Sequence, residues 1–86
     1  MKQFDYTIKD PLGIHARPAG QLAKAAKAFG ETVVTITKEG NTCKASQLMK
    51  IMSMGIKNGQ TVTIAAEGPA EDEAIEAMKK FFEENL

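Results

Sequence analysis

The sequence is poor in the residues that form disulfides and soft-ligand metal sites, with one cysteine and one histidine. Because Cys43 is the only cysteine, no internal disulfide can form, which suits a reducing compartment. Cys43 and His15 are the only soft ligands, whereas structural zinc takes four. We therefore expect no metal site and no bound cofactor.

The chain also lacks an excess of either charge, since 11 basic and 11 acidic residues give a formal net charge of zero. Proteins that bind nucleic acid usually carry a basic excess, because neutralisation of phosphate dominates their affinity. Tyr6 and four phenylalanines offer no obvious platform for base stacking. The composition therefore argues against a nucleic-acid partner.

Long apolar segments are missing as well. No stretch approaches the roughly 20 apolar residues that a membrane span needs, and the first five residues hold no apolar signal core. We therefore expect a cytoplasmic protein without membrane insertion. A chain of 86 residues has room for one domain, 1–86, and little room for a deep enzyme cleft. Its activity is expected at its surface.

Hydrophobic periodicity predicts four strands and three helices. In chain order, these are a strand at 4–8, a helix at 16–29, strands at 32–37 and 42–44, a helix at 47–54, a strand at 61–67 and a helix from 71. The order β-α-β-β-α-β-α predicts an α+β domain, in which helices cover one face of a four-stranded sheet.

The segment 13–19 (Gly-Ile-His-Ala-Arg-Pro-Ala) lies where the first loop becomes a helix. The first backbone N–H groups of a helix, here those of Ala16 and Arg17, have no partner inside it and form an anion site. Arg17 adds a planar charged fork that matches phosphate oxygens. Pro18 stiffens the first turn without losing a hydrogen bond. Because a neutral imidazole can accept phosphorus covalently, the pattern predicts a phosphohistidine at His15.

His15 also has simpler interpretations. A lone histidine at the start of a helix often only caps the helix or lies on the surface. A metal site is disfavoured, because four ligands are not available. The residues alone leave the cap and the phosphohistidine open, although Gly13, Arg17 and Pro18 at these offsets favour an anion site.

Segment 13–19 resembles the phosphohistidine signature of HPr, the histidine phosphocarrier of the bacterial sugar phosphotransferase system. The resemblance covers essentially the whole chain, including segments 52–56 (Met-Ser-Met-Gly-Ile) and 59–64 (Gly-Gln-Thr-Val-Thr-Ile). It implies an antiparallel open-faced β-sandwich with three helices on one side. It also implies that enzyme I, charged from phosphoenolpyruvate, phosphorylates His15 on Nδ1, and that IIA components of sugar permeases receive the group. Arg17 would hold the phosphoryl group in transit.

One position departs from the family. Many HPr proteins have a hydrogen-bonding side chain where this chain has Leu12, so any polar support there would come from the backbone. With no visible substrate pocket, the chain is expected to be a monomeric carrier and not a turnover enzyme. Two alternatives remain: an HPr-like regulatory module without a transport role, and an interaction domain that is never phosphorylated.

The short helix at 47–54 predicts a partner interface. Its five apolar residues span about 220° of a helical wheel, which is more than one buried stripe requires. Leu48, Met49 and Met52 are the set expected to face solvent, unless a bend or a nearby loop buries them. Methionine suits a surface that must fit several partners, and the resemblance implies that enzyme I and IIA proteins dock here.

Ser46 has two interpretations. By number it matches the regulatory serine of many HPr proteins, which would add an HPr kinase and a catabolite-control regulator to the partners. Counted back from segment 52–55, however, the regulatory position falls on Gln47, as if one extra residue lay around 33–39. We therefore expect Ser46 to be the N-cap of the short helix, a role that serine fills well.

Overall fold

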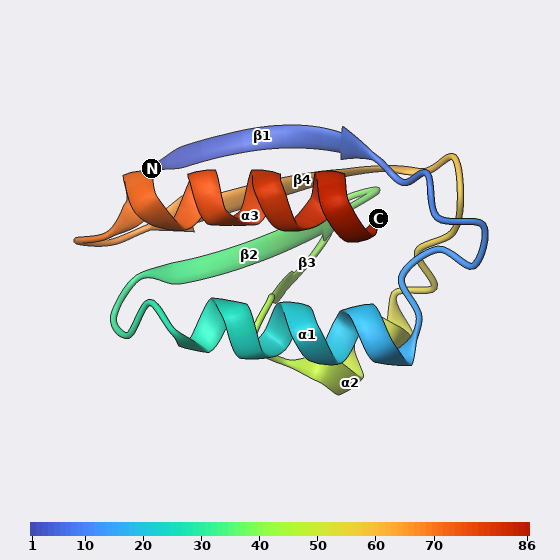
Figure 1. Cartoon of the computed structure of the whole chain (residues 1–86), viewed down its shortest axis with the longest axis horizontal. Helices are drawn as coiled ribbons and strands as arrows, with labels where there is room; N and C mark the ends of the chain where they lie inside the picture. Colours follow the sequence, from blue (N-terminus) through green and yellow to red (C-terminus); the bar gives the residue numbers. More distant parts are fainter.

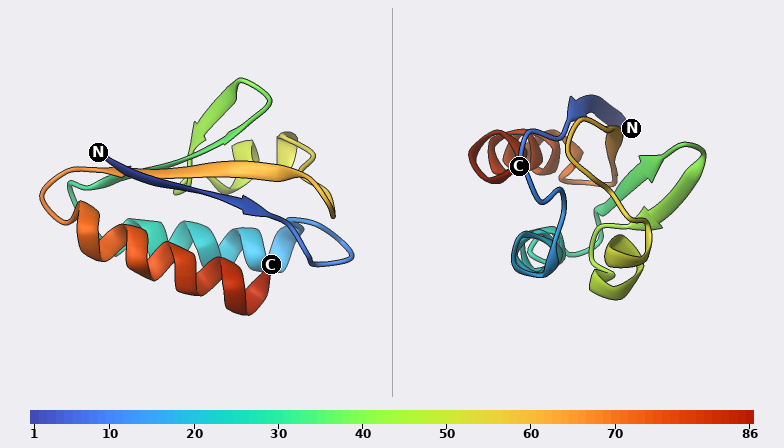
Figure 2. Two further views of the ribbon diagram at one scale, coloured as in Figure 1. Left: turned by 90° about the horizontal axis from the view of Figure 1, so that it is seen from above. Right: turned by 90° about the vertical axis from the view of Figure 1, so that its right-hand side faces the viewer.

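The computed structural model describes residues 1–86 as a four-stranded antiparallel sheet with three helices on one face (Figures 1 and 2). The strands are β1 (Lys2–Thr7), β2 (Val33–Lys38), β3 (Asn41–Lys44) and β4 (Thr61–Glu67), and the helices are α1 (Ala16–Lys27), α2 (Leu48–Ser53) and α3 (Glu71–Asn85). The strand order β1-β4-β2-β3 makes the chain-distant β1 and β4 neighbours. The predicted α+β fold and element order are confirmed.

The core lies between the sheet and the helices. Alternate residues of the two central strands are buried there, and 18 buried residues form one hydrophobic cluster. Phe82 of α3 belongs to this cluster and is fully buried. Its ring meets those of Phe4 and Tyr6 from β1 edge to face, with centroids 6.1 and 5.5 Å apart, a favourable geometry for aromatic pairs. This packing fixes α3 across β1 and its neighbour β4.

Helix boundaries differ from the prediction by one or two residues. Helix α1 ends at Lys27 and not at Phe29, because the N–H groups of Ala28, Phe29 and Gly30 bond to the carbonyl three residues back. Such bonds tighten the last turn of a helix into a 3₁₀ turn. Helix α2 loses both predicted end residues and has only six residues. No helix combines the length and apolar character that crossing a bilayer would require.

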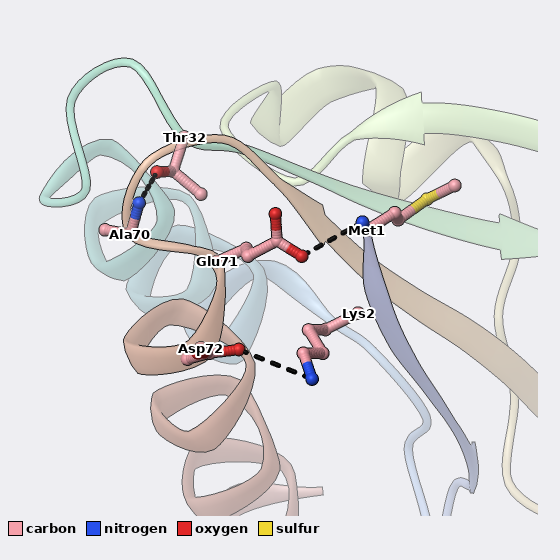
Figure 3. A network of polar contacts seen from close by, with 6 residues as sticks. All are labelled: Met1, Lys2, Thr32, Ala70, Glu71 and Asp72. Atoms are coloured by element: carbon pink, nitrogen blue, oxygen red, sulfur yellow. Dashed lines mark hydrogen bonds and ion pairs between the residues drawn. The ribbon is translucent and has the colours of Figure 1, made fainter.

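The start of α3 is held by polar contacts to β1 and to the loop before β2 (Figure 3). The buried Thr32 hydroxyl oxygen accepts a hydrogen bond of 2.8 Å from the Ala70 N–H. The amino group of Met1 lies 3.0 Å from the Glu71 carboxylate, and this hydrogen bond lowers the pKa of Glu71. The Lys2 ammonium lies 3.6 Å from Asp72. Acidic residues in a first helical turn are also favoured by the helix dipole.

Candidate functional site

His15 lies at the boundary between loop and helix that the sequence predicts. It is the N-cap of α1, with extended backbone angles (φ −105°, ψ −176°). Its carbonyl accepts the first bond of the helix, 2.9 Å from the Ala19 N–H. Its side chain makes no capping hydrogen bond and is 37% exposed. The imidazole therefore does not cap the helix. This excludes the interpretation that the His15 side chain acts only as a helix cap.

The first turn of α1 leaves two backbone donors free. The N–H groups of Ala16 and Arg17 have no hydrogen-bond acceptor within the chain, and Pro18 has no N–H. Such free donors at the positive end of the helix dipole are suited to an anion. Arg17 is exposed and forms no ion pair with a carboxylate, so its charge is available to a ligand. The predicted geometry of the anion site is present; occupancy by phosphate stays a prediction.

Asp10 is a site residue that the sequence reasoning missed. Its carboxylate oxygen Oδ1 accepts a 2.8 Å hydrogen bond from the Leu12 N–H and lies 3.8 Å from Nε2 of His15. The exposed Leu12 side chain takes no part. Polar support for the loop thus comes from Asp10 and the Leu12 backbone. The only sign of this contact in the sequence was that Asp10 lies five residues before His15 in the same loop.

A shallow polar depression surrounds the imidazole. Apart from Pro18, its lining is polar, and it consists of Asp10, His15, Arg17, Pro18, Gln21 and Asn85. Asn85 belongs to the end of α3, far from His15 in sequence. The next residue, Leu86, accepts bonds of 2.6 and 2.8 Å from the N–H groups of Lys9 and Asp10. The end of α3 therefore fixes the loop that presents His15, an arrangement that no local pattern predicts.

A second contact ties the same loop to the segment after α2. The Ile14 N–H donates to the Ile56 carbonyl at 3.0 Å. Gly13 has φ +70°, and a Cβ added there would lie only 2.3 Å from the same carbonyl oxygen. Gly13 is thus required both by its backbone angle and by the closeness of the neighbouring chain. Helix α2 also lies alongside α1 (Figure 2, right).

The face of α2 that was predicted to be solvent-exposed is exposed. Leu48, Met49 and Met52 have 36%, 76% and 41% of their surface accessible, whereas Ile51 is fully buried. Met54 packs partly against the core. We call these three exposed residues the methionine face. Neither a bend nor a neighbouring loop covers it, so this alternative is excluded; a docking role stays a prediction.

Ser46 is not the N-cap of α2, which corrects the sequence-based expectation. The helix begins at Leu48, its N-cap is Gln47, and no side chain caps it. Ser46 instead lies inside a turn closed by a 3.0 Å bond from the Gln47 N–H to the Lys44 carbonyl. Because this bond closes the turn before the helix starts, Ser46 lies one residue before the N-cap, Gln47. The register of β2 against β4 is continuous from Val33 to Thr37, so this part of the strand has no bulge.

Cys43 is half-buried on β3, with its thiol 3.3 Å from the sulfur of Met54. Burial raises the pKa of the Cys43 thiol, and the nearby Lys50 charge opposes this only in part. A thiol with a raised pKa has less of the reactive thiolate at neutral pH. The side chain therefore acts as packing between β3 and α2.

Comparison with known proteins places these features in a family. The family model described as the PTS HPr component phosphorylation site matches residues 2–84. Phosphocarrier protein HPr of Mycoplasma genitalium is 40% identical over 85 residues, which cover 99% of this chain and 97% of that protein.

Two solved structures share the fold. The histidine-containing phosphocarrier protein of a mycoplasma superposes with a TM-score of 0.89 at 39% identity, over 93% of this chain and 90% of its own. An HPr of Thermoanaerobacter tengcongensis gives 0.90 at 36% identity, over 96% and 92%. A family match over nearly the whole chain, with a histidine at the free end of its first helix, leaves one assignment: the chain belongs to the HPr family of phosphocarrier proteins.

Proposed function

We propose that this chain carries a phosphoryl group on His15, taking it from phospho-enzyme I and donating it to IIA components of sugar permeases. The observation that carries the proposal is the exposed His15 imidazole at a helix end whose Ala16 and Arg17 N–H groups are free. The anion-site geometry and the family membership support the same chemistry. The chain acts as a carrier that is restored after each cycle and not as a turnover enzyme.

The transfer is a displacement at phosphorus. The lone pair of Nδ1 of His15 attacks the phosphoryl group of the donor, the N–P bond forms, and the bond between phosphorus and the donor breaks. Because Nε2 faces Asp10, Nδ1 is the nitrogen on the opposite edge of the ring. The N–H groups of Ala16 and Arg17 and the Arg17 guanidinium stabilise the transferred charge. A nucleophile of the acceptor then attacks phosphorus and releases the neutral imidazole.

Partner docking is assigned to the methionine face and the adjacent start of α1. Three exposed apolar side chains on one short helix, next to a loop that carries the reacting group, support a shared surface for enzyme I and IIA proteins. Flexible methionines allow one surface to fit partners of different shape. We further propose that the carrier is monomeric and cytoplasmic, and that it binds neither nucleic acid nor membrane.

Regulation through Ser46 is a separate possibility. Ser46 is half-buried within a turn and its hydroxyl has no hydrogen bond within the chain, so a kinase would not have to break a capping bond. The neighbouring Gln47 cannot accept phosphate. Recognition by the kinase, and not the chemistry of the hydroxyl, then decides. We propose that an HPr kinase from another species modifies Ser46 poorly or not at all, and that transport is the role of this chain. Failure of an HPr kinase to label the protein with ATP is the expected result.

The decisive experiment uses mass spectrometry. The protein incubated with enzyme I and phosphoenolpyruvate should gain one phosphoryl group that is labile in acid and stable in base. His15→Ala should lose this gain while keeping its circular dichroism spectrum, because the imidazole makes no structural hydrogen bond. Labelling that persists in His15→Ala would falsify the assignment. Transfer onward to a IIA component separates a transport carrier from a regulatory module.

A further inference from the structure

Lys38, the last residue of β2, reaches across to the end of α2. Its ammonium donates hydrogen bonds of 3.1 Å to two backbone carbonyls, those of Met54 and Gly55. It pairs with no carboxylate, and its side chain is half-buried. The residue is thus committed to one backbone segment and is not a solvated surface charge.

The two carbonyls have no partner inside the helix. Met54 is the C-cap of α2 and Gly55 follows it in a left-handed conformation (φ +61°). Carbonyls at the end of a helix carry the negative pole of its dipole, so an ammonium there is favourable. A helix of six residues has little stability of its own and depends on contacts with the rest of the fold. Lys38 provides such a contact, together with the buried Ile51.

The segment held by Lys38 leads directly to the His15 loop. Ile56, one residue after Gly55, accepts the hydrogen bond from the Ile14 N–H. Lys38 therefore anchors one side of segment 54–56, and the His15 loop anchors the other. The methionine face lies on the preceding helical turns, so its position relative to His15 depends on this segment.

We infer that Lys38 is a positioning residue for phosphotransfer, which orients the methionine face relative to His15 by capping the end of α2. It touches neither the phosphoryl group nor its donor. The inference rests on the proposed function, because it assigns the docking of enzyme I to α2. Loss of the Lys38 ammonium leaves the end of α2 less ordered. Binding a partner then costs additional conformational entropy, because this segment must become ordered in the complex. The chemical step at His15 is unaffected.

The test compares three lysine variants in transfer from phospho-enzyme I. Lys38→Met keeps the aliphatic stem and removes the donor, and Lys38→Arg keeps a cationic donor. Lys44→Met is the matched control, because Lys44 is an exposed lysine of the paired strand β3 whose ammonium makes no hydrogen bond or ion pair. We expect an increase in KM of about fivefold for Lys38→Met with unchanged kcat. Lys38→Arg should restore most of the parent KM, and Lys44→Met should keep it.

A second measurement does not depend on enzyme I. Hydrogen exchange of the Met54 and Gly55 amides, which bond to carbonyls within α2, should become several-fold faster in Lys38→Met and stay near the parent rate in Lys44→Met. A parent protein that enzyme I does not label would overturn the proposed function, whatever the exchange rates are. A labelled parent, with equal KM values and equal exchange rates in Lys38→Met and Lys44→Met, would overturn the positioning role alone. A fall in kcat would also overturn it.

Discussion

At the scale of single residues, the environment of His15 is defined by Asp10. The carboxylate is held in place by the Leu12 N–H and faces the Nε2 edge of the imidazole. An N–H on Nε2 points toward this carboxylate, which favours the ring orientation that leaves Nδ1 free to react. Asp10 is therefore expected to orient the imidazole for transfer.

Asp10→Asn keeps an oxygen that can accept from Leu12 and removes the charge. We expect phosphoryl transfer from enzyme I to His15 to be about twofold slower in Asp10→Asn, since a partly exposed charged contact contributes below about 1 kcal/mol. The rate can be followed by phosphorus NMR. Asp5→Asn is the control, because Asp5 also accepts one hydrogen bond, from Thr63, but lies on β1. Equal rates in both variants would show that the Asp10 charge has no role.

At the scale of elements, the start of α3 depends on a residue from another part of the chain. Helix α3 has no capping side chain of its own, and its N-cap Ala70 donates to the buried Thr32 hydroxyl. Gly68 packs against Thr32 so closely that an added Cβ would lie 2.7 Å from the Thr32 Cα. The loop before β2 and the turn before α3 thus form one packed unit.

Thr32→Val retains the side-chain volume and removes the acceptor. The Ala70 N–H would then lack a partner, which should lower the free energy of unfolding by about 1–2 kcal/mol. Urea denaturation measures this change. Thr35→Val is the control, since Thr35 is a half-buried strand residue whose hydroxyl makes no hydrogen bond, and valine is well suited to strands. A loss of equal size in Thr35→Val would contradict the role given to the Thr32 hydroxyl.

At the scale of the whole molecule, the reactive loop is held between the end of α3 and the segment after α2. The backbone oxygen of Leu86 fixes the start of the loop, and the Ile56 carbonyl fixes its end through Ile14. Gly13 lies between these anchors, and a Cβ added to it would meet the Ile56–Lys57 backbone. The position of His15 is therefore set by two elements distant in sequence.

Gly13→Ala tests this arrangement. Its Cβ would clash with the Ile56 oxygen and would add the strain of a left-handed alanine, so we expect a loss of about 3 kcal/mol in unfolding free energy. Gly59→Ala separates the two effects, because Gly59 also has positive φ (+86°) but open space around it. It should lose only about 1–2 kcal/mol. If chemical denaturation gives equal losses for the two variants, the close contact carries no energetic weight.

Local patterns sufficed to predict part of this molecule. Strand alternation and helical spacing depend on neighbouring residues, which is why the seven elements, the start of α1 after His15 and the exposure of Met49 follow from the sequence. The Ser46 cap was wrong because a one-residue shift in a turn changes which residue precedes a helix. Propensity alone does not resolve such a shift.

The sequence by itself determined the α+β fold, the histidine at a helix start and the apolar excess of α2. Only the tertiary structure decided that Asp10 faces His15, that Asn85 lines the same depression and that Lys38 caps α2. The physical reason is that periodicity records which side of an element is buried. The partner of a loop side chain or of a free helix end is chosen by packing between segments that are far apart along the chain.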